Sequence, residues 1–357
     1  MPFDLQTDPQ SRHRTSYRAV ALWLFCLCFM VLVMVSLGGA TRLTGSGLSI
    51  MEWAPIMGTL PPLSDAEWQR LFTLYQQIPQ YTLVNQGFGI DGFKQIFWLE
   101  WTHRLWGRLI GFAFLLPMLW FAVRGALPRG LLKRLVLLLA LGGLQGGVGW
   151  FMVASGFDAD RTAVSPYRLV VHLVLALTLY SALLWTALGV WRLGRRRPDA
   201  LGAPTWLPPV SGAMLAMVAL TIVAGGFVAG LKAGLTYNTF PLMDGRLVPE
   251  GYAALQPFWR NLTENVAAVQ FDHRLLATVT AGSVLIACVA ALSGRLSAGV
   301  RRAVFAVTGV VCLQYALGVA TLLYVVPVGL ATAHQALAVL LLTAVIVLRH
   351  SQRRTAI

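Results

Sequence analysis

Four histidines stand inside long apolar stretches of this sequence, each a few residues from one end of its stretch. They are His103, His172, His273 and His334. A polar side chain inside such a stretch is costly and is usually kept for function. Neutral imidazole is a good ligand for iron, copper or zinc, so these residues predict metal chemistry. The other two histidines lie near the basic ends of the chain, where we expect them to be solvated.

The four histidines divide into two pairs along the chain, His103 with His172 and His273 with His334. Helix bundles build cofactor sites from side chains on facing helices, so each pair predicts one bis-imidazole site. A small residue follows each histidine by four positions, on the same helix face. These residues are Gly107, Ala176, Ala277 and Ala338. A flat macrocycle fits against such a face, which favours haem over a bare metal, although small residues also serve ordinary helix packing.

The polar residues that precede the histidines differ between the two pairs. Glu100 stands three residues before His103, on the same helix face, whereas Gln270 holds the matching position before His273. A carboxylate beside a bound cofactor is a candidate proton donor or acceptor, and an amide is not. We therefore expect a reactive first half and an electron-transferring second half. The alternative for Glu100 is an ion pair with Arg104.

An arginine directly follows one histidine of each pair, at Arg104 and Arg274. The guanidinium fork matches a carboxylate, so both arginines are candidate partners for haem propionates. Anchoring at the membrane surface is the alternative.

Long helices must position these residues, and the composition indicates that they cross a membrane. The chain has 357 residues, of which 57% are hydrophobic and only 12% are charged, too few charges for a soluble domain of this length. A spanning helix needs about 20 mostly apolar residues. Such stretches occupy 20–40, 98–123, 133–154, 168–191, 209–231, 267–292, 303–325 and 330–348. The sequence therefore predicts an all-α membrane protein with eight transmembrane helices.

The eight stretches repeat as two sets of four. Gly38-Gly39 and Gly225-Gly226 end corresponding stretches, and Leu144-Gln145 with Gly149 matches Leu313-Gln314 with Gly318. Each set has an even number of helices, so both halves begin on the same side of the membrane and have the same orientation. We expect two parallel-repeat four-helix bundles. The predicted units are an N-terminal half at 1–191, a cytoplasmic linker at 192–208 and a C-terminal half at 209–357.

The basic charge of the chain is distributed as a topology signal. The net charge is +14. Segments 1–19, 124–134, 192–208, 293–302 and 349–357 hold 17 Lys and Arg in 66 residues, and the opposite segments hold 8 in 114. Cytoplasmic loops carry such an excess. We therefore expect a multi-pass protein of the bacterial inner membrane with both termini cytoplasmic, in contact with lipid and not with nucleic acid.

The long external segment 41–97 contains a helix-start pattern. Ser64-Asp65-Ala66-Glu67 precedes an amphipathic run. This is the pattern of a capping box, and it predicts a short helix within the loop.

Two runs of the sequence resemble those of a known family. The run from Gly38 to Ser49, GGATRLTGSGLS, and the run from Glu100 to Arg104, EWTHR, resemble signatures of the haem A synthases. The likeness extends from about residue 20 to 348 and includes the duplicated four-helix plan and the four histidines. No cysteine pair occurs in 41–97, so the chain resembles the proteobacterial and mitochondrial type and not the members that carry such a pair.

The resemblance implies an activity and a role for each site residue. Haem A synthases oxidise the C8 methyl group of haem O to a formyl group, by successive hydroxylations and a dehydration, for cytochrome c oxidase. His103 and His172 would surround the substrate haem O, with Glu100 needed for the reaction. His273 and His334 would ligate a haem B. Haem O synthase and cytochrome oxidase assembly factors are candidate partners, and the electron donor stays unidentified.

Two other classes of protein share these features. A dihaem b-type membrane cytochrome would use the same histidines for electron transfer but would need no carboxylate at Glu100. A proton-coupled transporter would suit the repeated halves and the intramembrane polar residues. Transporters place their sites near the midplane, whereas these histidines cluster toward one face.

Overall fold

The structure is a computed structural model that describes residues 9–54, 57–159, 161–194 and 203–352. In these ranges every regular element is a helix. Eight helices in the described part are long and apolar enough to cross a membrane. They are α1 (Pro9–Leu43), α4 (Ile90–Val123), α5 (Leu131–Ala154), α6 (Pro166–Leu193), α7 (Leu207–Gly230), α9 (Val266–Leu292), α10 (Ala298–Leu323) and α11 (Val328–Ser351). The chain is therefore a multi-pass membrane protein of all-α class, as predicted.

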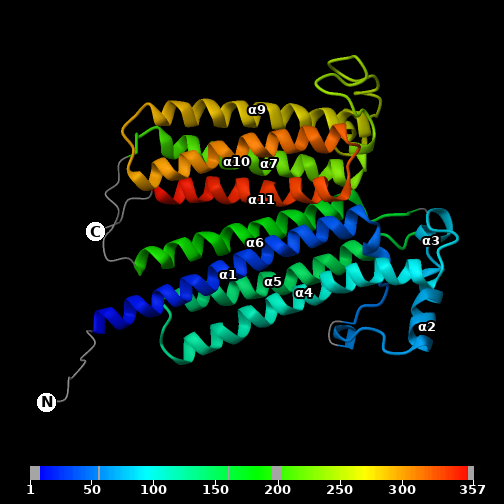
Figure 1. The fold of residues 1–357 in the computed structure, drawn as a ribbon, viewed down its shortest axis with the longest axis horizontal. Coiled ribbons are helices and arrows are strands. Elements are labelled where there is room, and N and C mark those ends of the chain that lie inside the picture. Colours follow the sequence, from blue (N-terminus) through cyan, green and yellow to red (C-terminus); the bar gives the residue numbers. More distant parts are fainter. Residues whose placement is uncertain (1–8, 55–56, 160, 195–202, 353–357) are drawn as a thin grey trace.

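The long helices pack in two sets that follow the order of the chain (Figure 1). In one set α1 packs on α4 and α6, and α5 contacts both of these. In the other set α7 packs on α9 and α11, and α10 contacts both of these. The sets meet where α1 contacts α11 and where α6 contacts α7 and α11.

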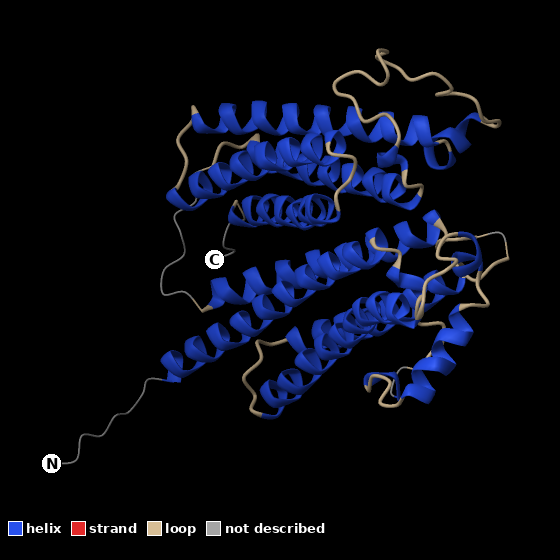
Figure 2. Ribbon diagram, turned by 45° about the vertical axis from the view of Figure 1, so that its right-hand side comes forward, coloured by secondary structure: helices blue, strands red, loops and turns tan. Residues whose placement is uncertain are grey.

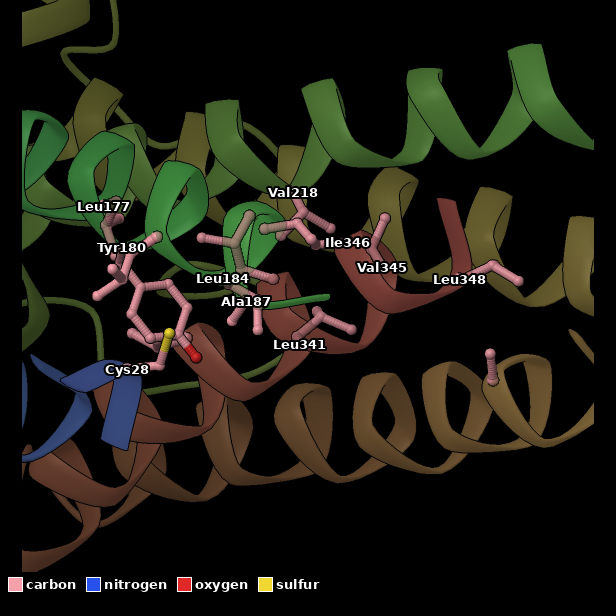
Figure 3. Close-up of a cluster of buried hydrophobic side chains, with 14 of the residues drawn as sticks. Cys28, Leu177, Tyr180, Leu184, Ala187, Val218, Leu341, Val345, Ile346 and Leu348 are labelled. Atoms are coloured by element: carbon pink, nitrogen blue, oxygen red, sulfur yellow. The ribbon is translucent and has the colours of Figure 1, made fainter. Parts of the chain in front are cut away.

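The core continues across the boundary between the two sets. Figure 3 shows Cys28 of α1, Tyr180 and Leu184 of α6, Val218 of α7 and Leu341 of α11 in one cluster of buried side chains. The Tyr180 hydroxyl lies 2.6 Å from the Thr343 hydroxyl, which adds a polar contact between α6 and α11. The two sets are thus joined by side-chain packing as well as by the chain itself.

The loops gather at the two ends of the long helices (Figure 2). The start of α1 and the end of α11 lie at one end, and the segments 44–89 and 231–265 lie at the other (Figure 1). The longer of these segments holds η1 (Ser46–Leu48), η2 (Met57–Thr59), α2 (Asp65–Tyr75) and α3 (Pro79–Leu83), and the other holds η3 (Ala233–Leu235), η4 (Phe258–Arg260) and α8 (Asn261–Glu264).

The predicted helix within the first long loop is confirmed as α2. Ser64 is its N-cap residue, and the Ser64 side chain accepts a hydrogen bond from the Glu67 backbone N–H. Trp68 of α2 is buried against Phe93 and Phe97 of α4, with ring centroids 6.3 and 4.8 Å away. This packing fixes α2 on the part of α4 that carries Glu100.

Helix α4 begins eight residues earlier than the sequence predicts, at Ile90 instead of 98. Its added turns bury Phe93, Ile96 and Phe97 under the first long loop. A hydropathy window misses them because Asp91 and Lys94 interrupt the apolar run. The loop predicted at 41–97 is therefore shorter, at 44–89.

One of the two terminal histidines is not solvated as expected. His350, in the last turn of α11, is 4% exposed, and its ring meets the Trp185 ring of α6 edge-on at 5.0 Å. The reason is that α11 extends to Ser351 and packs this turn against α6. The side chain of His13, the other terminal histidine, lies outside the described residues.

Candidate functional site

The four intramembrane histidines lie on the even-numbered spans, close to the end of the molecule that carries the long loops. His172, His273 and His334 come about two turns after the starts of α6, α9 and α11. His103 lies further along α4 because that helix starts inside the loop layer. All four therefore lie toward the end of their helices that carries the long loops.

Each of these histidine rings lies directly against a glycine of a neighbouring helix. The pairs are His103 with Gly38, His172 with Gly149, His273 with Gly225, and His334 with Gly318. A Cβ atom on the glycine would lie 3.3 Å from the ring in the first pair and 2.9, 2.9 and 2.7 Å in the others. No larger residue fits at these positions without displacing the imidazole. The repeated glycines are thus explained by close approach of the rings.

The members of each predicted pair lie within one set of helices. His103 and His172 lie on α4 and α6, and His273 and His334 lie on α9 and α11. Nowhere in the described ranges do three or more His, Cys, Asp or Glu side chains form a metal-binding group. Two imidazoles alone leave a bare ion poorly coordinated, whereas haem iron takes one or two axial side chains. The donor set therefore fits haem better than a bare ion.

The second pair includes a histidine oriented for metal binding. The Nδ1 atom of His273 lies 3.2 Å from the Thr221 carbonyl oxygen, which can only accept, so Nδ1 donates. This tautomer leaves Nε2 of His273 free for a metal. In the first pair, Nδ1 of His103 faces a carboxylate oxygen of Glu100 at 3.9 Å.

Two glutamines that the sequence showed only as part of the repeat lie beside the other histidines. Gln145 donates its side-chain N–H to the His172 carbonyl at 3.0 Å, and this nitrogen is 3.1 Å from Nδ1 of the ring. Gln314, at the matching position of the repeat, has its side-chain nitrogen 3.5 Å from Nε2 of His334. The Oε1 atoms of both glutamines and Nδ1 of His334 are buried without a hydrogen-bond partner among the described residues. Such unpartnered polar atoms are expected where a ligand completes the site.

Glu100 is a buried carboxylate held by an arginine. It is 4% exposed, and its Oε1 accepts from Nε of Arg104 at 2.7 Å. The remaining nitrogens of Arg104 donate to the carbonyls of Ile50 and Glu52, at 2.6 and 3.1 Å. Arg104 thus ties the first long loop to α4 and holds Glu100 next to His103.

The matching residues of the second half make a similar arrangement, in which an amide donor replaces the carboxylate acceptor. Gln270 is 3% exposed, and its amide donates to the carbonyls of Ala233 and Thr236 at 3.0 and 2.8 Å. Arg274 donates to the carbonyls of Tyr237 and Thr239. Both residues therefore accept from the arginine four positions later, but only Glu100 has a second oxygen, and this oxygen faces the histidine.

These features define a membrane protein with four histidines on its spans, of which one adjoins a buried carboxylate. A sequence model described as cytochrome oxidase assembly protein matches residues 21–346. A heme A synthase of Granulibacter bethesdensis is 63% identical over 346 residues, covering 97% of this chain and 89% of that protein. The heme A synthases of Rhodopseudomonas palustris and Nitrosospira multiformis are 48% and 47% identical, covering 94% of this chain and 91% and 94% of their own lengths. The chain belongs to the haem A synthase family.

Proposed function

We propose that this chain is an oxidoreductase that converts the C8 methyl group of haem O to a formyl group, giving haem A for cytochrome oxidase. The observation that carries the proposal is the position of His103 beside buried Glu100, in the same set of helices as His172 and in a chain of this family. The reaction proceeds by two successive hydroxylations and a dehydration. Haem O is the substrate, and the two imidazoles hold its iron.

The second pair, His273 and His334, holds a haem B. The hydrogen bond from Nδ1 of His273 to Thr221 supports this role because it leaves the other ring nitrogen free. Haem B supplies electrons to the reaction when it is bound. The amide of Gln270 donates to loop carbonyls and provides no proton acceptor, which fits a site that only transfers electrons.

Glu100 acts as the proton donor or acceptor of the first site. Its burial, its distance of 3.9 Å from the His103 ring and its bond to Arg104 support this role. The carboxylate keeps a second oxygen that Arg104 does not engage, and this is the oxygen facing His103. Arg104 is a positioning residue for that carboxylate.

Arg104 and Arg274 are also candidate partners for the haem propionates. Both stand beside a histidine at the loop-bearing end, and Nε of Arg274 is buried without a partner among the described residues. Their terminal nitrogens already bind loop carbonyls. A propionate would therefore share these guanidinium groups with the loops.

The two sets of helices are duplicated bundles, one for each haem. The matched histidine and glycine contacts support this division, with units at 1–191 and 209–357. The chain lies in a bacterial inner membrane with both termini cytoplasmic, because its basic residues concentrate in the two terminal segments and in alternate loops, at 1–19, 124–134, 192–208, 293–302 and 349–357. Haem O synthase and oxidase assembly factors are the proposed protein partners.

Identification of the bound haem tests this function. The chain is co-expressed with a haem O synthase, purified, and its extracted haem is separated by chromatography. We expect haem A together with haem B. Haem B alone would instead support a dihaem cytochrome, and a folded protein without haem would support a transporter.

A further inference from the structure

The two adjacent glycines of α1 contact both halves of the molecule. Gly38 lies against the ring of His103, within its own set of helices. Gly39 lies against the side chain of Gln335 in α11 of the other set, where a Cβ atom would be 2.8 Å from the Gln335 Cδ atom. Gln335 directly follows His334. Two consecutive glycines of α1 thus touch a histidine of one pair and the neighbour of a histidine of the other.

The adjacent glycines of α7 repeat this arrangement in the opposite direction. Gly225 lies against the ring of His273 in its own set. Gly226 lies against Val170 and Leu173 of α6, and a Cβ atom there would be 3.1 Å from Val170 Cγ2 and 3.2 Å from Leu173 Cδ2. Leu173 directly follows His172. The two histidine sites are therefore linked twice, each time through a pair of glycines and the residue after a histidine.

The two links differ in chemistry, because one is polar and the other is apolar. Gln335 donates from Nε2 to the Val35 carbonyl of α1 at 2.8 Å. Leu173, at the matching position, makes only apolar contact. The bond to Val35 is directional, so it specifies the position of α11 along α1 more narrowly than an apolar contact does. Gln335 is one residue from His334, and Val35 is one turn from Gly38. A shift of α1 relative to α11 at this bond would therefore move both sites.

We propose that Gln335 is a positioning residue that sets the orientation of His334 and the separation of the two histidine sites. This inference rests on the proposed function, in which each pair holds a haem. Because Gly38 and Gly39 have no side chains, His103 and Gln335 both lie close to the backbone of α1. The hydrogen bond from the Gln335 carboxamide to Val35 holds α11 in this position.

The first test replaces Gln335 with Met, which keeps the length of the side chain and removes the hydrogen bond to Val35. The control is Thr343→Val, which breaks the hydrogen bond between Tyr180 and Thr343, another contact between the two sets made by the same helix. Both variants are purified with haem, and the electron paramagnetic resonance spectrum of ferric haem B and the rate of haem A formation are measured. The spectrum reports the relative orientation of the axial imidazoles.

We expect the Gln335→Met spectrum to shift and the rate to fall about tenfold at unchanged haem content, since small displacements of reacting groups are costly. Thr343→Val should show neither change. An unchanged spectrum and rate in Gln335→Met would overturn the inference, and so would equal effects of the two variants, which would indicate ordinary packing.

A second test does not depend on the accumulation of Gln335→Met. Gly39→Ala places a methyl group where the carboxamide lies, and Gln335→Ala frees that space. We expect Gly39→Ala to shift the haem B spectrum strongly and the double variant to restore part of the shift. Additive effects would show that the contact does not couple the sites.

These outcomes are distinguishable from a failure of the proposed function. If the wild-type chain binds no haem, the proposed haem A synthase function is wrong, and the inference about Gln335 falls with it. If wild type and Gln335→Met both bind haem with the same spectrum and rate, only the positioning role of Gln335 fails.

Discussion

At the scale of single residues, one difference between the halves determines the proposed chemistry. Glu100 and Gln270 occupy matching places, each almost fully buried and each bonded to the arginine four residues later. The amide of Gln270 satisfies two loop carbonyls, whereas the carboxylate of Glu100 presents an oxygen to His103. The sequence alone predicted this difference, because the two positions align through the histidines.

Glu100→Gln should abolish catalysis while leaving the fold intact. The amide keeps the size of the side chain and can still accept from Arg104, but it cannot exchange a proton, so we expect haem A formation to fall about 100-fold or more. The extracted haem is quantified by chromatography, with haem B content as the measure of folding. Turnover that survives this substitution would remove Glu100 from the chemistry.

The glycines beside the histidines leave the space that the imidazole rings occupy. Gly318→Ala places a methyl group 2.7 Å from the His334 ring, so we expect loss of haem B from that site. Gly309→Ala is the matched control, because it lies on the same helix with no atom within 4 Å of the new methyl group. Alanine there should be neutral or stabilise the helix by up to about 1 kcal/mol. Equal haem content in the two variants would contradict the close approach that we describe.

The sequence indicated the histidines but not the residues that support them. Gln145 and Gln314 were visible only as parts of a repeat, although each precedes by four positions the glycine that faces the same histidine. That spacing places glutamine and glycine on one helix face. The contact of Gln335 with Gly39 could not be predicted, because nothing in a single sequence says which residues of the two halves meet.

At the scale of elements, the first long loop is an ordered layer that supports α4. Its helix α2 buries Trp68, Phe72 and Tyr75, and Arg104 binds the carbonyls of Ile50 and Glu52. The capping box predicted the start of α2, whereas the early start of α4 was missed. Its first turns are buried by a loop and not by lipid, so a scan for membrane spans does not detect them.

A charge cluster in this loop makes the layer sensitive to acid. Arg70 forms hydrogen bonds of 2.8–2.9 Å with the carboxylates of Glu52 and Glu67, and these bonds lower the pKa of both carboxyls below the ordinary value. A lowered pKa in the folded state stabilises the loop at neutral pH, and this contribution is lost as pH falls through the folded values. Limited proteolysis of the loop should therefore accelerate below about pH 4.

Arg70→Met is the control for this pH dependence. It removes the bonds to both carboxylates, so we expect faster proteolysis at neutral pH and a weaker change between neutral and acidic pH. A variant with the same pH profile as the wild-type protein would show that the cluster does not stabilise the loop.

At the scale of the whole molecule, the number and order of the helices were predictable and their mutual packing was not. Hydropathy gave the eight spans because each must be long and apolar to cross a membrane. The faces that pack between the two sets are as apolar as those that face lipid, so composition does not distinguish them. Apolar packing and specific polar contacts such as Tyr180 with Thr343 and Gln335 with Val35 together form the boundary.

The distribution of basic residues predicts the orientation of the molecule. In a chain whose native cysteines are replaced by alanine, Val248→Cys in the second long loop should react with a membrane-impermeant thiol reagent in intact cells. Arg295→Cys, between α9 and α10 at the opposite end, should react only after the cells are opened. Both positions are exposed. Labelling in the reverse pattern would place the haem sites at the cytoplasmic face.

If the two histidine pairs hold two different haems, matched variants of the two sites should differ in their haem content. His103→Ala and His273→Ala are each co-expressed with haem O synthase, and the haem extracted from the purified proteins is identified. We predict that His273→Ala retains haem O but loses haem B, and that His103→Ala retains haem B but loses haem O, with haem A absent from both. If both variants lost both haems, or if the redox difference spectrum of His273→Ala matched that of the wild-type protein, the assignment of one haem to each pair would be wrong.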